Sequence, residues 1–248
     1  MSDRFDLPRG RVLPVSAVEL HVLPGDHPFA EQHRAAAAAN WTREVAAKPA
    51  LFDGPITLFS SMRIEDGRLV GTCHMTRYSS FLHWRSMRGQ RDGEHAYAHA
   101  LIVSADGKLV AARMGPRTVH AGKVYFAAGS CDAGDVRGSM IDVDWNMARE
   151  VAEETGLDLS AMQAENGYHI YSIESGTVII RRYVSVETAA ELARRVAEHV
   201  ARDAEPEIEG AVIIATGARP DDAFADHMRA IVDWHFATVD DGTFGAGA

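Results

Sequence analysis

Three glutamates, Glu150, Glu153 and Glu154, stand close together in a stretch that is predicted to be helical. In an α-helix their spacing of i, i+3 and i+4 places the three carboxylates on one face. Like charges this close repel one another unless a cation neutralises them. Hard divalent cations such as Mg²⁺ bind carboxylate oxygens and keep several waters for a phosphate-bearing substrate. The spacing by itself favours an ordinary solvated acidic face, so the metal hypothesis needs further support.

The same stretch carries signals for both ends of a helix. Asp144 is the predicted N-cap, and Gly156 is the predicted residue that ends the helix. The opposite face is apolar and is expected to pack under a sheet. Its residues are Met147, Ala148, Val151 and Ala152.

The nine residues from Arg149 to Leu157 are similar to the Nudix signature Arg-Glu-U-x-Glu-Glu-x-Gly-U, where U is aliphatic. Every fixed position of that pattern matches. The resemblance implies a Nudix-type α/β/α sandwich and the hydrolysis of a pyrophosphate bond with Mg²⁺, or with Mn²⁺ in its place. It implies that Glu150, Glu153 and Glu154 bind the metal and that Arg149 and Glu150 belong to the catalytic residues.

The loop before the helix departs from the family pattern. The family has Phe-Pro-Gly-Gly, five residues, a glutamate and seven residues before the arginine, whereas this chain has Phe126-Ala127-Ala128-Gly129 and then 19 residues in place of 13. We place the insertion within Ser130–Ser139. No glutamate occurs in the loop, and we assign its bracing role to Asp142, leaving Asp144 to cap the helix.

Other site residues are predicted on both sides of the helix. Arg113 and Arg117 could bind phosphates bidentately and are the candidate substrate-binding residues. Glu207 stands where related proteins often place a further glutamate, which makes it a candidate general base beside Glu150. An acidic surface loop explains Glu207 equally well. His95 and His99 share one side of a predicted strand, but they lack a third zinc ligand and are interpreted as structural.

Strand and helix patterns alternate along the chain, which predicts an α/β fold with a mixed sheet. Strands are expected at 56–64, 68–75, 95–103, 108–114, 123–126, 168–174, 177–184 and 211–215. Helices are expected at 28–47, 78–87, 187–201 and 221–236, in addition to the charged helix. The first 27 residues read as an extended arm with one strand.

We divide the chain into an N-terminal α+β extension (1–90), a Nudix hydrolase domain (91–238) and a flexible tail (239–248). The segment Pro49–Pro55, which follows a helix with Trp41, resembles the N-terminal part of Nudix proteins that split UDP-sugars. This likeness carries no catalytic residue. It ranks a UDP-sugar-like substrate first and a coenzyme A or ADP-ribose-like substrate second.

The amino-acid composition indicates which kinds of partner the protein is expected to bind. The 248 residues carry a net charge of −10 without a compensating basic cluster, which argues against nucleic-acid binding. No apolar run reaches the roughly 20 residues that span a membrane, and no signal peptide is recognised. Cys73 and Cys131 lack metal-ligand spacing and are expected to be reduced thiols in a cytoplasmic protein.

The resulting hypothesis is a Mg²⁺-dependent hydrolase of a nucleoside diphosphate linked to another group, with a homodimer left open. The alternative is a Nudix-like nucleotide-binding or regulatory module without turnover, which the missing loop glutamate supports. Hydrolysis of a nucleotide diphosphate panel with Mg²⁺ discriminates between the two.

Overall fold

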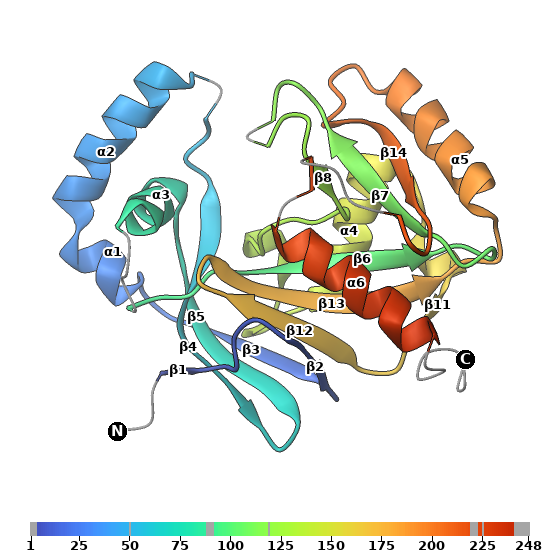
Figure 1. Cartoon of the computed structure of the whole chain (residues 1–248). Coiled ribbons are helices and arrows are strands. Elements are labelled where there is room, and N and C mark those ends of the chain that lie inside the picture. Colours follow the sequence, from blue (N-terminus) through green and yellow to red (C-terminus); the bar gives the residue numbers. More distant parts are fainter. Residues whose placement is uncertain are drawn as a thin grey trace.

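Two mixed β-sheets and six α-helices build the described part of the molecule (Figure 1). The computed structural model describes residues 4–49, 51–87, 92–118, 120–218, 223–224 and 226–240. The helices are α1 (Pro28–Gln32), α2 (Arg34–Ala47), α3 (Tyr78–Ser86), α4 (Val143–Thr155), α5 (Ala189–Arg202) and α6 (Asp226–Asp240). The predicted α/β class with a mixed sheet is confirmed.

The first sheet has the strand order β1-β4-β5-β3-β10-β9. Its strands are β1 (Phe5–Asp6), β3 (Val18–Leu23), β4 (Pro55–Glu65), β5 (Arg68–Arg77), β9 (Val136–Arg137) and β10 (Met140–Ile141). The β4–β5 hairpin closes through Asp66 and Gly67, which both have positive φ, 48° and 73°. Two consecutive positive φ angles match the right-handed twist of the flanking strands, and the Asp-Gly pair supplies them. The hairpin predicted at this turn is confirmed.

The second sheet has the order β14-β7-β6-β13-β12-β2, with β8 paired to β7 and β11 paired to β13. Its strands are β2 (Val12–Val15), β6 (Ala96–Val103), β7 (Leu109–Met114), β8 (Val124–Tyr125), β11 (Gln163–Ala164), β12 (Tyr168–Ile173), β13 (Gly176–Val184) and β14 (Ile208–Ile214). Strands β6 and β13 run parallel in the centre, and the other paired neighbours run antiparallel.

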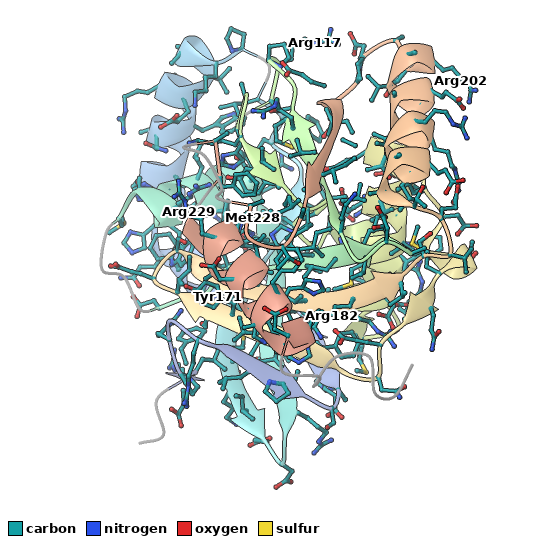
Figure 2. All side chains as sticks on the ribbon, turned by 45° about the vertical axis from the view of Figure 1, so that its right-hand side comes forward. Arg117, Tyr171, Arg182, Arg202, Met228 and Arg229 are labelled. Carbon is teal, nitrogen blue, oxygen red and sulfur yellow. The ribbon has the colours of Figure 1, made fainter. Side chains whose placement is uncertain are left out.

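Helices cover both faces of the second sheet. Ala98, Ala100 and Ile102 of β6 belong to the same core cluster as Met147 and Val151 of α4. The intervening residues Leu101 and Val103 pack in a separate cluster with Met228 and Ile231 of α6. Because successive strand residues point to opposite faces, α4 and α6 lie on opposite sides of the sheet. Figure 2 shows Met228 on the helix that crosses this second face.

Each sheet includes a strand from a part of the chain that mainly builds the other sheet. Strand β2 from the N-terminal arm pairs with β12 in the second sheet, and β10 from the middle of the chain pairs with β3 in the first. The arm therefore holds β1, β2 and β3 rather than the one strand expected. The domain boundary predicted after residue 90 falls in 88–91, outside the described residues, as does 241–248 of the predicted tail.

An ion pair ties the N-terminal arm to the second sheet. Arg9 donates to both carboxylate oxygens of Glu94, at 3.0 and 2.9 Å; the Glu94 side chain is 6% exposed, whereas the Arg9 side chain is 40% exposed. Thr177 also donates to Glu94, at 3.0 Å. Because the buried Glu94 carboxylate is satisfied by these donors from two separate segments, Glu94 has a structural role. No helix in the described part is long and apolar enough to cross a membrane.

Candidate active site

Helix α4 begins one residue after Asp142, which is its N-cap. The Asp142 carboxylate accepts the backbone N–H of Trp145 at 2.9 Å. The prediction that Asp144 caps the helix is therefore wrong. Asp144 lies in the first turn and accepts hydrogen bonds from Arg181 at 2.7 Å and Tyr168 at 2.9 Å. The helix ends at Gly156 with φ of 68°, as predicted, because this left-handed conformation suits glycine.

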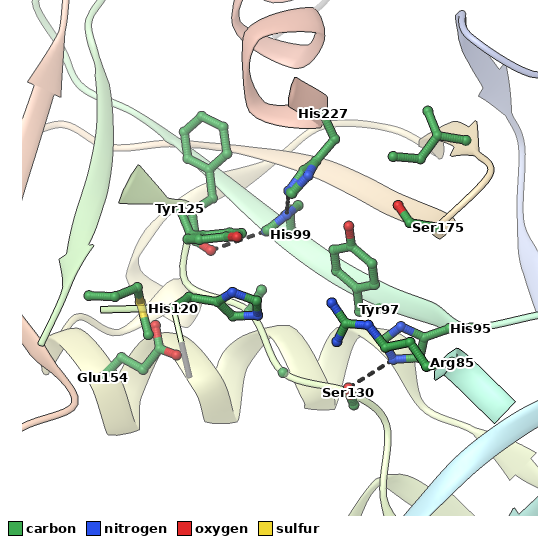
Figure 3. A pocket seen from close by; sticks show the side chains of 15 residues that line it. Arg85, His95, Tyr97, His99, His120, Tyr125, Ser130, Glu154, Ser175 and His227 are labelled. Carbon is green, nitrogen blue, oxygen red and sulfur yellow. Dashed lines mark hydrogen bonds between the residues drawn. The ribbon is translucent and has the colours of Figure 1, made fainter. Parts of the chain in front are cut away.

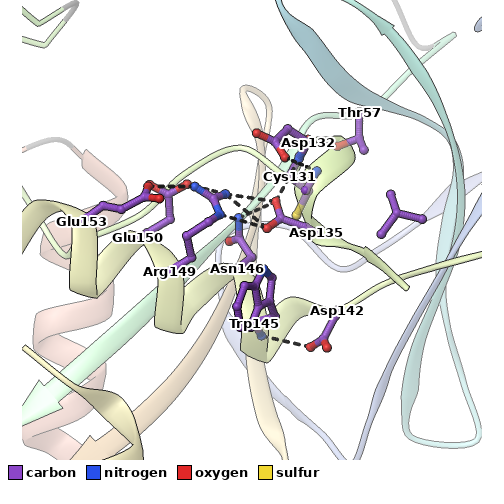
Figure 4. A network of polar contacts seen from close by, with 12 residues as sticks. Thr57, Cys131, Asp132, Asp135, Asp142, Trp145, Asn146, Arg149, Glu150 and Glu153 are labelled. Atoms are coloured by element: carbon purple, nitrogen blue, oxygen red, sulfur yellow. Dashed lines mark hydrogen bonds and ion pairs between the residues drawn. The ribbon is translucent and has the colours of Figure 1, made fainter. Parts of the chain in front are cut away.

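Arg149 is braced by Asp135 and not by Asp142 (Figure 4). Its guanidinium donates to the Asp135 carboxylate from Nε at 3.3 Å and from Nη2 at 3.2 Å to each oxygen. Asp135 is fully buried and also accepts from Asn146 Nδ2 and from the Asp132 backbone N–H, both at 2.9 Å. The bracing role assigned to Asp142 is wrong, because that carboxylate is used to cap the helix.

The sequence contained a signal for Asp135 that the loop prediction missed. Five residues separate Gly129 from Asp135, which is the spacing of the family's glutamate. The extra six residues are 136–141, between the brace and the helix, so the insertion overlaps the second half of the predicted range Ser130–Ser139 and extends two residues past it. They form the β9–β10 hairpin, whose Met140 pairs with His21 of β3. The insertion therefore extends the first sheet.

Arg149 also holds two of the three glutamates. It pairs with Glu150 at 2.9 Å and with Glu153 at 3.0 Å. The Glu150 side chain is 14% exposed, whereas the Glu153 side chain is 60% exposed. Glu154 is buried against the sheet. On the apolar face Met147 and Val151 are buried as predicted, but Ala152 is exposed, because Glu154 takes the buried position in that turn.

Burial raises the pKa values of the two inner glutamates. The pKa of Glu150 rises to about 7, although Arg149 beside it acts to lower it. The pKa of Glu154 is well above its ordinary value because of burial and because of the nearby carboxylates of Glu150 and Glu207. The Ala128 backbone N–H hydrogen bonds to Glu154 and acts in the other direction. A cation placed here would restore both ionised forms.

Gly129 sets how closely the loop approaches Glu150. A Cβ atom added at Gly129 would lie 1.7 Å from Oε1 and 2.1 Å from the carboxyl carbon of Glu150. A Cβ atom there would require the Glu150 carboxylate to move, so glycine allows the loop backbone to approach the carboxylate in the position that Arg149 holds it. This explains why glycine follows Ala127 and Ala128, which replace the family's proline and glycine.

The glutamate pair fits the chemistry of a hard-cation site. Among the described residues no three His, Cys, Asp or Glu side chains stand close enough to hold a metal ion by themselves. Mg²⁺ commonly binds one or two carboxylates and completes its shell with water and substrate phosphate. Glu150 and Glu154 supply such a pair, and exposed Glu207 lies near enough to raise the pKa of Glu154.

The predicted phosphate-binding arginines lie outside the cavity beside these glutamates. Arg113 donates to the Gly122 carbonyl at 3.1 Å. Arg117 is 61% exposed, pairs with Glu205 at 3.5 Å, and lies at the outer edge of the molecule in Figure 2. Neither lines the cavity described next, so their role stays a prediction.

A cavity of about 410 Å³ opens beside Glu154 (Figure 3). Its walls are mainly aromatic and imidazole rings. The ring-bearing side chains are His95, Tyr97, His99, His120, Tyr125, Phe126 and His227. Arg85 of α3 also lines it, so the N-terminal region contributes to the cavity. Of this group the sequence analysis named His95, His99 and Phe126; Tyr97 lies between the two histidines, whereas His120, Tyr125 and His227 come from other segments.

No protein-family model matches the chain, and no curated protein matches it. Solved structures with a similar fold include a Nudix hydrolase from Nitrosomonas europaea, with 18% identity and a TM-score of 0.35 over 60% of this chain and 90% of that chain. The MutT protein from Methanosarcina mazei Go1 has 16% identity and a TM-score of 0.38 over 59% of this chain and 95% of its own.

A bifunctional NMN adenylyltransferase/ADP ribose pyrophosphatase from Francisella tularensis, complexed with AMP and a Mn ion, is also similar. It has 13% identity and a TM-score of 0.37 over 65% of this chain and 44% of its own. Identities and TM-scores this low assign no family and no activity. The function must therefore rest on the side chains of this chain.

Proposed function

We propose that this chain is a Nudix-type hydrolase that cleaves the pyrophosphate bond of a nucleoside diphosphate linked to another group. The observation that carries the proposal is the arrangement around Arg149. This residue is fixed by buried Asp135 and in turn holds Glu150 and Glu153, while Glu154 lies beside a ring-lined cavity. An ordinary solvated acidic face would need neither a buried carboxylate that fixes its arginine, as Asp135 fixes Arg149, nor a close approach of the loop backbone to one glutamate, as at Gly129 and Glu150.

Glu150 and Glu154 would hold the cation, Mg²⁺ or Mn²⁺, and the Glu153 side chain would have to turn toward them to become the third predicted ligand. When bound, such a cation neutralises the diphosphate and lowers the pKa of an attacking water. Arg149 keeps Glu150 and Glu153 in place through its ion pairs. Asp135 keeps Arg149 in place, because its buried carboxylate accepts from two guanidinium nitrogens.

A carboxylate must accept the proton of the attacking water. Glu150 and Glu207 remain the two candidates for this general base. Glu150 lies against the loop at Gly129, within the buried part of the site. Glu207 is exposed, yet its charge reaches Glu154. The proposed substrates keep their order, a UDP-sugar-like compound before one like coenzyme A or ADP-ribose.

The brace weakens the main argument for the alternative class. A binding module without turnover was supported by the absence of the loop glutamate, and Asp135 now supplies the carboxylate at that place. Three clustered carboxylates also have little use in a protein that only binds an anion, because they repel it when no metal is present.

The test is a hydrolysis assay with a panel of UDP-sugars, ADP-ribose and coenzyme A, with Mg²⁺, with Mn²⁺ and with excess chelator. The expected product is a nucleoside monophosphate, or a phosphopantetheine fragment from coenzyme A, formed only with a metal. Glu154→Gln is the inactive control. Binding of panel members without any hydrolysis would reject the proposal and support the binding module.

A further inference from the structure

We propose that the ring-lined cavity binds the nucleoside monophosphate half of the substrate, with the base against the rings and a phosphate at Arg85. This inference deepens the proposed function and rests on it for the identity of the bond that is cleaved. It assigns the nucleotide-binding cation to α3, in the N-terminal region, in place of Arg113 or Arg117.

The cavity wall is a connected series of rings from three parts of the fold. Tyr97 and His99 alternate along β6, and His95 directly precedes the strand in the same alternation, so the three rings share one face. Their ring centroids are 5.2 Å apart for the first pair and 5.4 Å for the second. His227 of α6 lies 5.5 Å from His99, and Tyr125 of β8 lies 5.5 Å from His227. Such a wall presents flat faces suited to a planar heterocycle.

Burial favours the neutral form of three imidazoles in this wall, those of His95, His99 and His120. Burial, assisted by the charge of Arg85, lowers the pKa of His95 to about 3 and also lowers that of His120. Burial beside His227 lowers the pKa of His99 as well. His99 Nδ1 lies 3.1 Å from the Phe126 carbonyl and so must donate its proton there, which leaves Nε2 to accept from His227 Nε2 at 3.4 Å. Neutral rings with single donors and acceptors suit an uncharged base rather than a phosphate.

Among the described residues that line the cavity, Arg85 is the one arginine or lysine. Its positive charge acts to lower the pKa values of four cavity side chains, so Arg85 lies near several parts of the wall. These side chains are His95, Tyr97, His120 and Tyr125. In Figure 3 its side chain extends over the cavity near Tyr97 and His95. No ion pair ties Arg85 to any carboxylate in the described chain, whereas Arg117 has Glu205 as its partner.

The opposite end of the cavity is Glu154, with Ala128 and Gly129 of the loop. A nucleotide with its base against the rings would thus have its phosphates between a guanidinium and the proposed metal-binding carboxylates. A volume of about 410 Å³ is within the usual range for small-molecule sites and exceeds the needs of a phosphate alone. The size, the rings and the single cation together favour a nucleoside monophosphate over a hexose phosphate.

The experiment measures binding of the hydrolysis products, because they cannot be turned over. Isothermal titration with UMP, AMP, uridine and glucose 1-phosphate, with and without Mg²⁺, is compared for the wild type, Arg85→Gln, Arg85→Lys and Arg117→Gln. We expect nucleoside monophosphate to bind more tightly than the hexose phosphate. Arg85→Gln should weaken monophosphate binding at least about tenfold, as expected for a lost charge-assisted hydrogen bond.

The controls separate the cation from the rings. Arg85→Gln should leave uridine binding unchanged, Arg85→Lys should keep part of the monophosphate affinity, and Arg117→Gln should match the wild type. Tyr97→Leu should weaken uridine and UMP alike. Tighter binding of glucose 1-phosphate, or UMP binding in Arg85→Gln within twofold of the wild type, overturns the inference. Intact UMP binding without any hydrolysis of the panel would reject only the proposed function.

Discussion

Asp135 and Arg149 form a buried ion pair across 14 positions of the chain, with the β9–β10 hairpin between them. The pair connects the loop to the charged helix, and the Asp135 carbonyl also accepts the backbone N–H of Asp142 at 2.8 Å. The hairpin is in turn paired with β3, so the first sheet supports the loop that carries the brace.

This pair predicts a strongly non-additive double-mutant cycle. Arg149→Ala should lower stability by about 3–5 kcal/mol, because it leaves the Asp135 charge buried without its ionic partner. Asp135→Ala should cost less, because Arg149 keeps Glu150 and Glu153 as partners. The double variant should be little worse than Arg149→Ala. Urea unfolding gives the stabilities, and turnover should fall in parallel. The control is Asp142→Ala, which removes a helix cap and should cost about 1 kcal/mol. Additive losses at Asp135 and Arg149 would show that they do not act as a pair.

The buried glutamates predict a loss of stability with rising pH when metal is absent. The folded-state pKa of Glu150 is about 7, above its ordinary value of 4.5, so the charged form is disfavoured in the fold. Stability should therefore be unaffected by this group below pH 4.5 and should fall by about 3 kcal/mol as pH rises to 7. Thermal unfolding with chelator measures this change, and Glu150→Gln should flatten it.

Added Mg²⁺ should restore the stability that the wild type loses at neutral pH. It should stabilise Glu150→Gln and Glu154→Gln less, because each variant lacks one of the carboxylates. Both variants should lose turnover by orders of magnitude, as expected when a metal-activated water is lost. Glu153→Gln should follow them in activity but change metal-free stability little, because its side chain is 60% exposed. Near wild-type turnover in Glu154→Gln would refute the metal assignment.

The contact at Gly129 predicts that a single methyl group disturbs the site. Gly129→Ala would place Cβ 1.7 Å from Glu150 Oε1, so the loop or the carboxylate must move. A displacement of about 1 Å can cost about a hundredfold in rate, and we expect a loss of that size. Gly134→Ala is the matched control in the same loop. The Cβ atom added there would have Asp132 Oδ1 as its nearest neighbour, at 3.0 Å. Equal activities of the two variants would contradict the proposed role.

A separate pH effect is expected from the first sheet. Burial and the neighbouring His74 lower the pKa of His27 from 6.5 to about 4. The folded state therefore holds His27 neutral, and its contribution of about 3 kcal/mol is present above pH 6.5 and is lost as pH falls to 4. Urea titrations from pH 8 to 4 should show His27→Gln less stable at pH 8 and closer to the wild type at pH 4. A constant difference over this range would exclude a neutral buried His27.

The sequence by itself determined the local elements and the glutamate face of α4. Helix periodicity and the glycine at 156 act over one or two turns, and strand alternation acts over a few residues. The same local rules located the Asp66-Gly67 hairpin and placed His95 and His99 on one side of the predicted strand 95–103, of which β6 forms all but the first residue. These features need no information about distant parts of the chain.

The tertiary structure alone decided which residues meet. Asp135 could become the brace because β10 pairs with β3, and that pairing joins segments more than 100 positions apart. Asp142 caps the helix in place of the predicted Asp144, because the Asp144 carboxylate accepts hydrogen bonds from Arg181 and Tyr168 of the second sheet. Arg85 reached the cavity because α3 packs beside β4, which contacts β6. Contacts of this kind depend on how sheets stack, and local residue patterns do not encode that choice.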